Sequence, residues 1–215
     1  MILGHWDVRG AGQPIRNLLH YLGFKYSEIK YADEKSWFEI AKPDFKGDFA
    51  NLPYLIDGEK IITESHAILV YLALKAKRID LLGETFAKEL HFVQIRSFFM
   101  DIRNKFYNIA MDKSIEDIGF EIKQKVMPSL TQLSKHLANN SFVCGDLTVI
   151  DFAIVELLEW ILLQDKELLK DMQNLQFLIE RVYNLPGVKE YQQSKEIPKF
   201  FLWESYANKN LKICY

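Results

Sequence analysis

Residues 48–65 read Asp-Phe-Ala-Asn-Leu-Pro-Tyr-Leu-Ile-Asp-Gly-Glu-Lys-Ile-Ile-Thr-Glu-Ser, and this stretch decides the fold. Asp57-Gly58 separates two apolar runs, which is a strong local signal for a β-hairpin. Ser65 follows the second run and precedes apolar residues at helical spacing, so we expect it to be the N-cap of a helix that ends near Leu74. The stretch therefore predicts two antiparallel strands and then a helix.

The residues before this stretch predict a strand, a helix and a second strand. Residues 2–8 form a short apolar run, and Pro14 stands where the first turn of a helix tolerates a missing N–H. Gly23 ends the helical pattern, and residues 27–31 alternate weakly. Because a strand, helix and strand in succession imply a parallel pair, the whole segment reads βαβ-ββα with a mixed sheet.

From Thr85 onwards the periodicity is helical and predicts no strand. We expect one long helix over residues 86–109 and a second over residues 118–137, with a kink at Pro128. Thr148 and Asp151 have the spacing of a capping box at the start of an apolar helix. Shorter helices are expected at residues 175–183 and 188–194.

The predicted fold class is thus an α+β N-terminal domain followed by an all-α C-terminal domain. A length of 215 residues fits one large domain or two small ones. We place the N-terminal domain at residues 1–75, a linker at residues 76–84 and the helical domain at residues 85–215. The linker begins with the polar stretch 76–80.

Composition excludes several classes of function. The chain has 27 Lys and Arg against 29 Asp and Glu, so it has no strong field to attract nucleic acid or an anionic membrane. Two cysteines, Cys144 and Cys214, cannot form a disulfide framework, and a reducing compartment is expected. We expect no export signal, and Glu156 and Glu159 interrupt the most apolar run, so no membrane span is predicted.

The familiar catalytic patterns are also missing from the sequence. No close histidine or cysteine pairs suggest a metal site, and Gly-x-Ser-x-Gly is absent. Gly10-Ala11-Gly12 lacks the third glycine of a dinucleotide-binding loop.

Three blocks of the N-terminal domain resemble the cytosolic glutathione S-transferases, and the mu class most of all. They are residues 1–10, 48–58 and 62–69. The resemblance implies a thioredoxin-like N-terminal domain, a helical domain with a hydrophobic site, and glutathione as co-substrate with no tightly bound cofactor. It further implies a cytoplasmic homodimer that conjugates glutathione, as thiolate, to small hydrophobic electrophiles in detoxification.

The resemblance assigns glutathione contacts around the hairpin. It implies a cis bond between Leu52 and Pro53, with the Leu52 backbone pairing with the cysteinyl backbone of glutathione like an added strand. Glu64, where the mu class has Gln, would bind the α-amino group, and Ser65 the γ-glutamyl carboxylate at a helix N-terminus. The alternatives are that Pro53 merely starts an edge strand and that Glu64 only favours the helix dipole.

The remaining glutathione contacts are less closely tied to a motif. Trp37 and Lys42 resemble the residues that hold the glycyl end, although the loop before Trp37 is shorter than in the mu class. Core packing explains Trp37 equally well. Trp6 and Asn51 complete the implied set.

His5 is the main departure from the mu pattern, which has a tyrosine that donates a hydrogen bond to the sulfur. A thiol titrates near about 8.5, so its ionisation at neutral pH needs stabilisation of the thiolate. His5 can substitute as the donor, another group such as Arg9 or a backbone N–H in residues 9–11 can replace it, or the site binds glutathione with weak catalysis. All three interpretations stay open at this point.

The helical domain is expected to supply the electrophile pocket and part of the dimer. Asp101 resembles the acid that reaches the glutathione of the partner subunit, and Phe49 resembles the aromatic that keys into the partner's helical domain, in a two-fold homodimer. Met111 stands where the mu class has an assisting hydroxyl. Most aromatics at helical spacing are core, but the pocket candidates are Phe106, Tyr107, Met111, Phe200, Phe201, Trp203 and Tyr206.

The sequence therefore predicts an enzyme, a glutathione transferase. The alternative is a weakly active or non-catalytic protein that binds glutathione or other ligands, or serves a structural role, on the same fold. A protein-interaction module on this scaffold is a third interpretation, which the complete set of implied tripeptide contacts disfavours.

Overall fold

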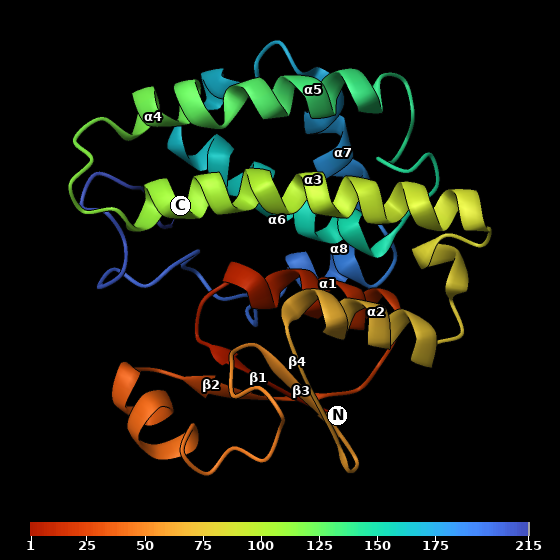
Figure 1. Ribbon diagram of the computed structural model, residues 1–215, viewed down its shortest axis with the longest axis vertical. Helices are drawn as coiled ribbons and strands as arrows, with labels where there is room; N and C mark the ends of the chain where they lie inside the picture. The colour runs from red at the N-terminus through yellow and green to blue at the C-terminus, as the bar shows by residue number, and fades with distance from the viewer. Residues whose placement is uncertain (215) are drawn as a thin grey trace.

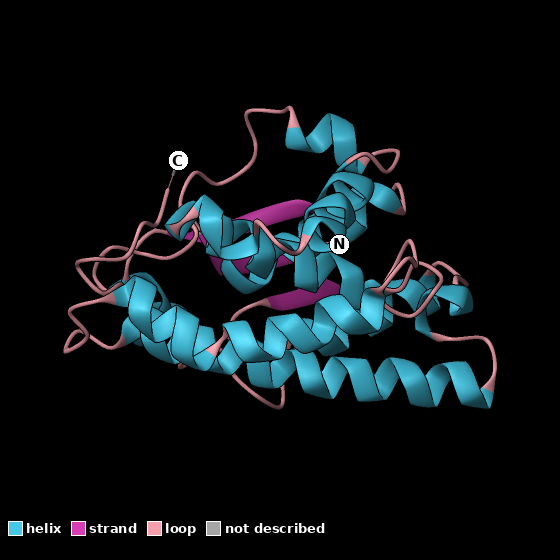
Figure 2. Ribbon diagram, turned by 90° about the horizontal axis from the view of Figure 1, so that it is seen from above, coloured by secondary structure: helices cyan, strands magenta, loops and turns pink. Residues whose placement is uncertain are grey.

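A computed structural model describes residues 1–214. A four-stranded sheet carries two helices on the face that looks toward the rest of the chain, and a group of longer helices packs above them (Figure 1). Seen from above, the helices cover the strands (Figure 2). None of the described helices combines the length and apolar character needed to cross a membrane.

The sheet has the predicted mixed topology. Its strand order is β2-β1-β3-β4, in which β1 and β2 are parallel and the other two pairs are antiparallel. Asp57 pairs with Lys60, so the hairpin loop is Gly58-Glu59, and Gly58 takes the positive φ of 61° that such a loop needs. The strand bounds are β1 Ile2–Trp6, β2 Ser27–Tyr31, β3 Tyr54–Asp57 and β4 Lys60–Thr63.

Helices α1 (Gln13–Tyr21) and α2 (Ser65–Lys75) follow β1 and β4. The prediction that Ser65 is the N-cap is wrong, because Ser65 is the first residue of α2 and Glu64 precedes it in the cap position. The physical reason is the short connection. β4 ends at Thr63, so Glu64 alone turns the chain, and it does so with a positive φ of 67°.

The helical part confirms the predicted all-α character, with one correction. The single helix expected over residues 118–137 is two helices that meet at Val126. Pro128 lies in the first turn of the second helix, where its missing N–H is tolerated, so the proline begins a new helix instead of kinking an existing one. The helices are α3 Phe86–Met111, α4 Ile118–Lys125, α5 Met127–Leu137, α6 Val149–Gln164, α7 Gln173–Tyr183 and α8 Val188–Gln192.

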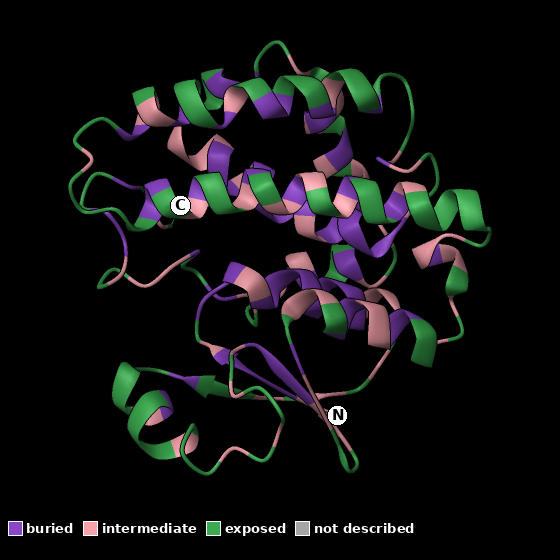
Figure 3. Ribbon diagram, in the orientation of Figure 1, coloured by how far each residue is buried: buried purple, intermediate pink, exposed green. Residues whose placement is uncertain are grey.

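Helix α6 lies at the centre of this part. Its predicted capping box is confirmed, because the Thr148 N–H donates to the Asp151 carboxylate at 2.8 Å. Asp151 also accepts the Val143 N–H at 3.0 Å, so the start of α6 is tied to the preceding loop. Buried residues gather where α6 and α3 meet α1 and α2, whereas α4 and α5 expose their outer faces (Figure 3).

One hydrophobic core runs through both parts of the chain. Leu19 from α1, Ile68 from α2 and Phe152 from α6 belong to the same buried cluster. The linker is part of it, because residues 79–82 form a short helical turn in which Leu81 is fully buried. The expected loose polar linker is therefore a packed connection, and the division at residues 75 and 85 stays a prediction.

A buried ion cluster joins the loop after β1 to α6. Arg9 donates to Glu156 through Nε at 2.9 Å and through Nη2 at 2.7 Å. Nη2 also contacts Glu159 and the Tyr183 hydroxyl, and Arg9 and Glu156 have side chains exposed by only 5% and 7%. The cluster links residues 147 positions apart, so it holds the two parts of the chain in register.

We expect the substitution Glu156→Leu to lower the free energy of unfolding by about 3 kcal/mol, because it leaves the buried Arg9 charge with fewer partners. Urea unfolding followed by circular dichroism measures this loss. The control is Asp146→Ala, which breaks the exposed pair with Lys88 and is expected to cost about 1 kcal/mol or less. Equal losses in the two variants would contradict a structural role for the buried cluster.

Candidate functional site

Four predicted glutathione contacts meet at the start of β3 and α2. The Leu52-Pro53 peptide bond is cis, as the resemblance implies. The Asn51 side chain accepts the Leu52 N–H at 2.9 Å and donates to the Glu64 carboxylate at 3.1 Å. Since Ser65 follows Glu64, the structure brings Asn51, Leu52, Glu64 and Ser65 together.

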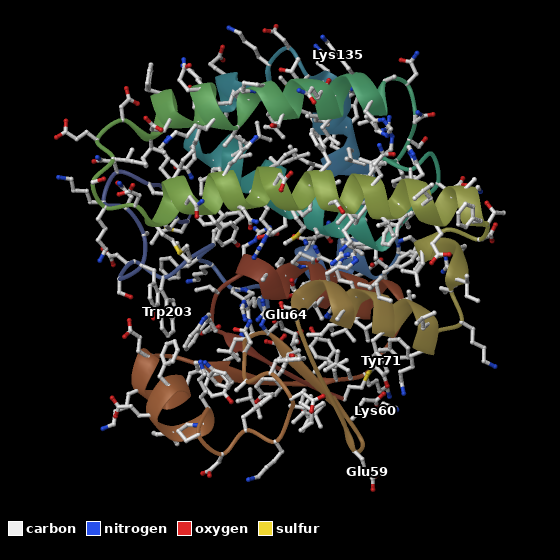
Figure 4. All side chains as sticks on the ribbon, viewed as in Figure 1. Glu59, Lys60, Glu64, Tyr71, Lys135 and Trp203 are labelled. Atoms are coloured by element: carbon white, nitrogen blue, oxygen red, sulfur yellow. The ribbon has the colours of Figure 1, made fainter. Side chains whose placement is uncertain are left out.

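Glu64 has a backbone conformation that side-chain-bearing residues rarely adopt. Its φ is 67° and its ψ is 112°, and its side chain is exposed where α2 begins (Figure 4). Such conformations cost on the order of 1–3 kcal/mol and cluster at functional sites. The conformation sets Glu64 apart from an ordinary acid in a first helical turn.

The residues predicted for the glycyl end lie in the helical segment Ser36–Ala41 and directly after it, between β2 and β3. Trp37 is 2% exposed and packs against Tyr31 and Tyr54, with ring centroids 5.2 and 6.1 Å away, so the core interpretation describes its ring. Lys42 is exposed, with its Nζ 5.3 Å from the centre of the Phe38 ring.

Trp6 belongs to an aromatic surface beside these residues. The centre of its ring lies 6.0 Å from that of Phe38 and 4.5 Å from that of Trp203, a residue of the C-terminal tail (Figure 4).

His5 is buried at the end of β1 with no hydrogen-bond partner for either ring nitrogen among the described residues. Gly12 makes room for the ring, because a Cβ at this position would lie 2.4 Å from His5 Cδ2. Burial, followed by the charges of Arg16 and Arg103, lowers the pKa of His5 well below its ordinary value. The ring is therefore neutral at physiological pH, and it keeps one N–H to donate.

The alternatives to His5 as sulfur donor are narrowed by the structure. Burial alone would lower the pKa of Arg9, but the adjacent carboxylates raise it. Because two carboxylates lie beside one guanidinium, the cluster supplies no net positive charge. The N–H groups of Arg9 and Gly10 donate to the carbonyls of Phe200 and Phe201 at 2.7 and 3.2 Å. Of residues 9–11, Ala11 is the one whose N–H makes no hydrogen bond to the tail within residues 1–214.

A cavity of about 40 Å³ lies between the two parts of the chain. Ala11, Ser65 and Tyr107 all line this cavity, so it brings together residues that the sequence assigned to the sulfur, the glutathione and the electrophile. No group of three His, Cys, Asp or Glu side chains in residues 1–214 is placed to hold a metal ion. The other lining residues are Gly10, Pro14, His66, Leu69, Phe99, Met100, Arg103, Ile150, Ala153, Glu156, Leu157 and Trp160.

Of the predicted electrophile pocket, only Tyr107 lines this cavity. The prediction is wrong for Phe106 and Phe201, which have no exposed surface because both rings pack on Trp160, at 4.9 and 5.5 Å. Met111 is 44% exposed as the last residue of α3, and it does not line this cavity.

The remaining tail aromatics lie away from the cavity. Phe200 is 45% exposed, and Tyr206 stacks on Trp203, which packs on Trp6. Trp203 and Tyr206 thus belong to the aromatic surface around Trp6, and none of the three tail residues lines the cavity.

The two residues predicted to act across a dimer are exposed in the single chain. Asp101 lies on the outer side of α3, and Phe49 exposes 69% of its surface in the loop before β3. α3 also exposes Phe86, Leu90 and Val93, which are spaced by three or four residues and so form one apolar stripe.

The sequence reasoning missed Arg103. This residue lines the cavity with its guanidinium 4.4 Å from the centre of the Tyr107 ring. The signal was a charged residue inside an apolar helical stripe, because Phe99, Arg103 and Phe106 are spaced by four and three residues.

Comparison with known proteins identifies the family. The model of the glutathione S-transferase N-terminal domain matches residues 1–74, and that of the C-terminal domain matches residues 100–195. A glutathione S-transferase of Tyrophagus putrescentiae is 32% identical over 206 residues, covering 93% of this chain and 92% of the relative. The chain belongs to the glutathione S-transferase family. Its activity is glutathione conjugation.

Further relatives of this transferase include mu-class proteins. The class-mu 26 kDa isozyme 51 of Fasciola hepatica is 31% identical, covering 94% of this chain and 90% of the relative. Human glutathione S-transferase Mu 3 is also 31% identical, covering 93% and 90%. The crystal structure of the glutathione S-transferase Blo t 8 superposes with a TM-score of 0.86 at 28% identity, covering 98% of this chain and 100% of that one. These names favour the enzyme over the alternative of a non-catalytic binding protein.

His66, which lines the cavity, makes the stability of the protein depend on pH. Burial, and then the charge of Arg96, lowers the pKa of His66 to about 4, below the value of about 6.5 expected in the unfolded chain. The folded state thus binds fewer protons between these values, so stability is complete above about pH 6.5 and falls as the pH drops toward 4.

In the variant His66→Gln, we expect the loss of stability at low pH to be smaller than in the wild type, by on the order of 2–3 kcal/mol. Urea unfolding of both proteins at about pH 7 and about pH 4.5 measures the difference. Parallel losses in the wild type and the variant would exclude His66 as their source.

Proposed function

We propose that this transferase binds glutathione along residues 51–54 and holds its sulfur as a thiolate where Ala11 and Ser65 meet at the cavity. The observation that carries the proposal is the grouping of Asn51, Leu52, Glu64 and Ser65 beside that cavity. The cis bond before Pro53 and the unusual backbone of Glu64 support the same location.

Each of these residues has a chemical role in the proposed complex. The Leu52 backbone pairs with the cysteinyl unit, and the N-terminus of the eleven-residue helix α2 at Ser65 takes the γ-glutamyl carboxylate. Glu64 pairs with the α-amino group. Lys42 offers a positive charge to the glycyl carboxylate, with the Trp6 and Trp37 rings beside it.

The reaction follows from the thiolate. A sulfur lone pair forms the new carbon–sulfur bond, the displaced group leaves with its bonding electron pair, and the thiol proton passes to water. The cavity is lined by apolar side chains such as Leu69, Phe99 and Met100, which favours small hydrophobic electrophiles. Since about 40 Å³ holds only a few water molecules, the electrophile binds at its mouth beside Tyr107.

We further propose the setting that family membership supports. The physiological role is detoxification in the cytoplasm, with glutathione as a co-substrate and no tightly bound cofactor. The glutathione site belongs to residues 1–75 and the electrophile side to residues 85–215, joined by residues 76–84.

We expect His5→Phe to lower kcat/KM for conjugation by about two- to tenfold, because a neutral N–H donor contributes about 0.5–1.5 kcal/mol. The KM for glutathione stays nearly constant, since the tripeptide contacts are elsewhere. The control His20→Phe alters a histidine that stacks on Tyr191 at the far end of α1 and keeps full activity. Unaltered turnover in His5→Phe would remove His5 from the mechanism.

We also propose a two-fold homodimer in which Phe49 of one subunit docks on the helical part of the other. A hollow between α3 and α5 offers an apolar seat for that ring. It is lined by His91, Gln94, Ile95, Phe98, Gln132, Leu133 and His136. Asp101 lies exposed on the same helix and would reach the partner's glutathione.

We expect Phe49→Ser to shift the protein from dimer to monomer at micromolar concentration, because it removes the aromatic that fills the hollow. Light scattering measures the mass in solution. Phe120→Ser is the matched control, since it removes a ring 55% exposed on α4 and leaves the dimer intact. A monomeric wild type would contradict the proposal.

A further inference from the structure

Formation of a thiolate at neutral pH needs a hydrogen-bond donor or a positive charge near the sulfur. A thiol has a pKa near about 8.5, and an adjacent cation lowers it by favouring the charged form. His5 is buried and neutral, so it offers a dipole and no charge. The candidates for a positive charge are the arginines around the site.

Two of these arginines are committed to structural partners. Arg9 is held between Glu156 and Glu159. Arg16 is fully buried, and it donates to the Glu28 carboxylate at 2.9 Å and to the Val8 carbonyl at 3.0 Å. Both guanidinium groups are paired with carboxylates, and neither residue lines the cavity, although the charge of Arg16 also reaches His5.

Arg103 is in a different position. It forms no salt bridge with any of residues 1–214, and it lines the same cavity as Ala11 and Ser65. Its guanidinium lies over the Tyr107 ring, 4.4 Å from the centre, which fixes the direction of the side chain. Because the site is half-buried, the charge acts through less water than it would on the surface.

We propose that Arg103 stabilises the glutathione thiolate in this protein, doing with a positive charge what a tyrosine hydroxyl does in the mu class. The inference rests on the proposed glutathione site and names the residue that activates the sulfur there. When the thiol ionises, its proton passes to water and the guanidinium keeps all of its own protons. Arg103 is thus an electrostatic partner of the sulfur and not a general base.

The other charged groups at the cavity are consistent with this role. Burial, and then the charges of Arg16 and Arg103, lower the pKa of His5, so the charge of Arg103 is one of two that reach the end of β1. His66 from α2 is neutral near pH 7, because its pKa is about 4. Glu156 from α6 is the acid that lines the cavity, and Arg9 holds it with two hydrogen bonds.

The test is a titration of the thiol of bound glutathione, followed by thiolate ultraviolet absorbance with protein in excess. In Arg103→Met we expect the pKa of this thiol to rise by about 1 to 2, the amount that loss of a charge-assisted hydrogen bond produces. At about pH 6.5, kcat/KM falls by about 10- to 100-fold, and the loss disappears above the new pKa. Arg103→Lys, which keeps the charge, recovers most of the rate.

Two controls separate this proposal from simpler explanations. Lys105→Met removes one positive charge from the side of the same helix that faces α5, where Lys105 donates to Ser129, and we expect the thiol pKa to stay at the wild-type value. S-methylglutathione has no thiol to ionise, so Arg103→Met should bind it as tightly as the wild type does. Arg103→Gln, a shorter polar variant, replaces Arg103→Met if the latter does not fold.

The outcomes are distinct. An unchanged thiol pKa in a folded Arg103→Met or Arg103→Gln protein overturns the proposal. If the rate then falls for anionic electrophiles alone, Arg103 binds the electrophile and does not activate the sulfur. Failure of the wild type to bind S-methylglutathione would instead contradict the proposed glutathione site itself. A raised thiol pKa with intact S-methylglutathione binding supports Arg103 as the activating residue.

Discussion

The buried cluster of Arg9 with Glu156 and Glu159 is the interaction on which the rest of the site depends. It fastens the loop after β1 to the central helix α6, and this loop carries Ala11 to the cavity and Gly12 to the His5 ring. A buried ion pair is costly to desolvate, so it stabilises a protein only with good geometry and full hydrogen bonding. Here it fixes how the two parts of the chain meet.

The same cluster determines which chemistry is available at the sulfur. It compensates the Arg9 charge, and His5 is kept neutral by burial and by the charges of Arg16 and Arg103. In a site with a neutral histidine where the mu class has the tyrosine hydroxyl, a positive charge from elsewhere stabilises the thiolate further. Helix α3 supplies one in Arg103, which is possible because this helix forms one wall of the cavity between the two parts.

The sequence predicted the fold almost completely, because the fold depends on local signals. The hairpin at Gly58, the capping box at Thr148 and the long helix α3 each follow from residues close together in the chain. The error at Ser65 was a shift of one residue, caused by a connection too short to be seen in a pattern. The cis bond before Pro53 came from family resemblance and not from local chemistry.

The site was less predictable because it depends on contacts distant in sequence. Arg9 and Glu156 are 147 positions apart, and nothing in either neighbourhood announces their pairing. Phe106 and Tyr107 are adjacent, yet one is core and the other lines the cavity, a distinction that helical periodicity is too coarse to make. The most direct measurement of the account's central claim is a crystal structure of the wild-type protein with glutathione. It predicts the sulfur at the cavity beside Ala11, within reach of the Arg103 guanidinium. A sulfur held away from that cavity, with Arg103 turned to solvent, would contradict it.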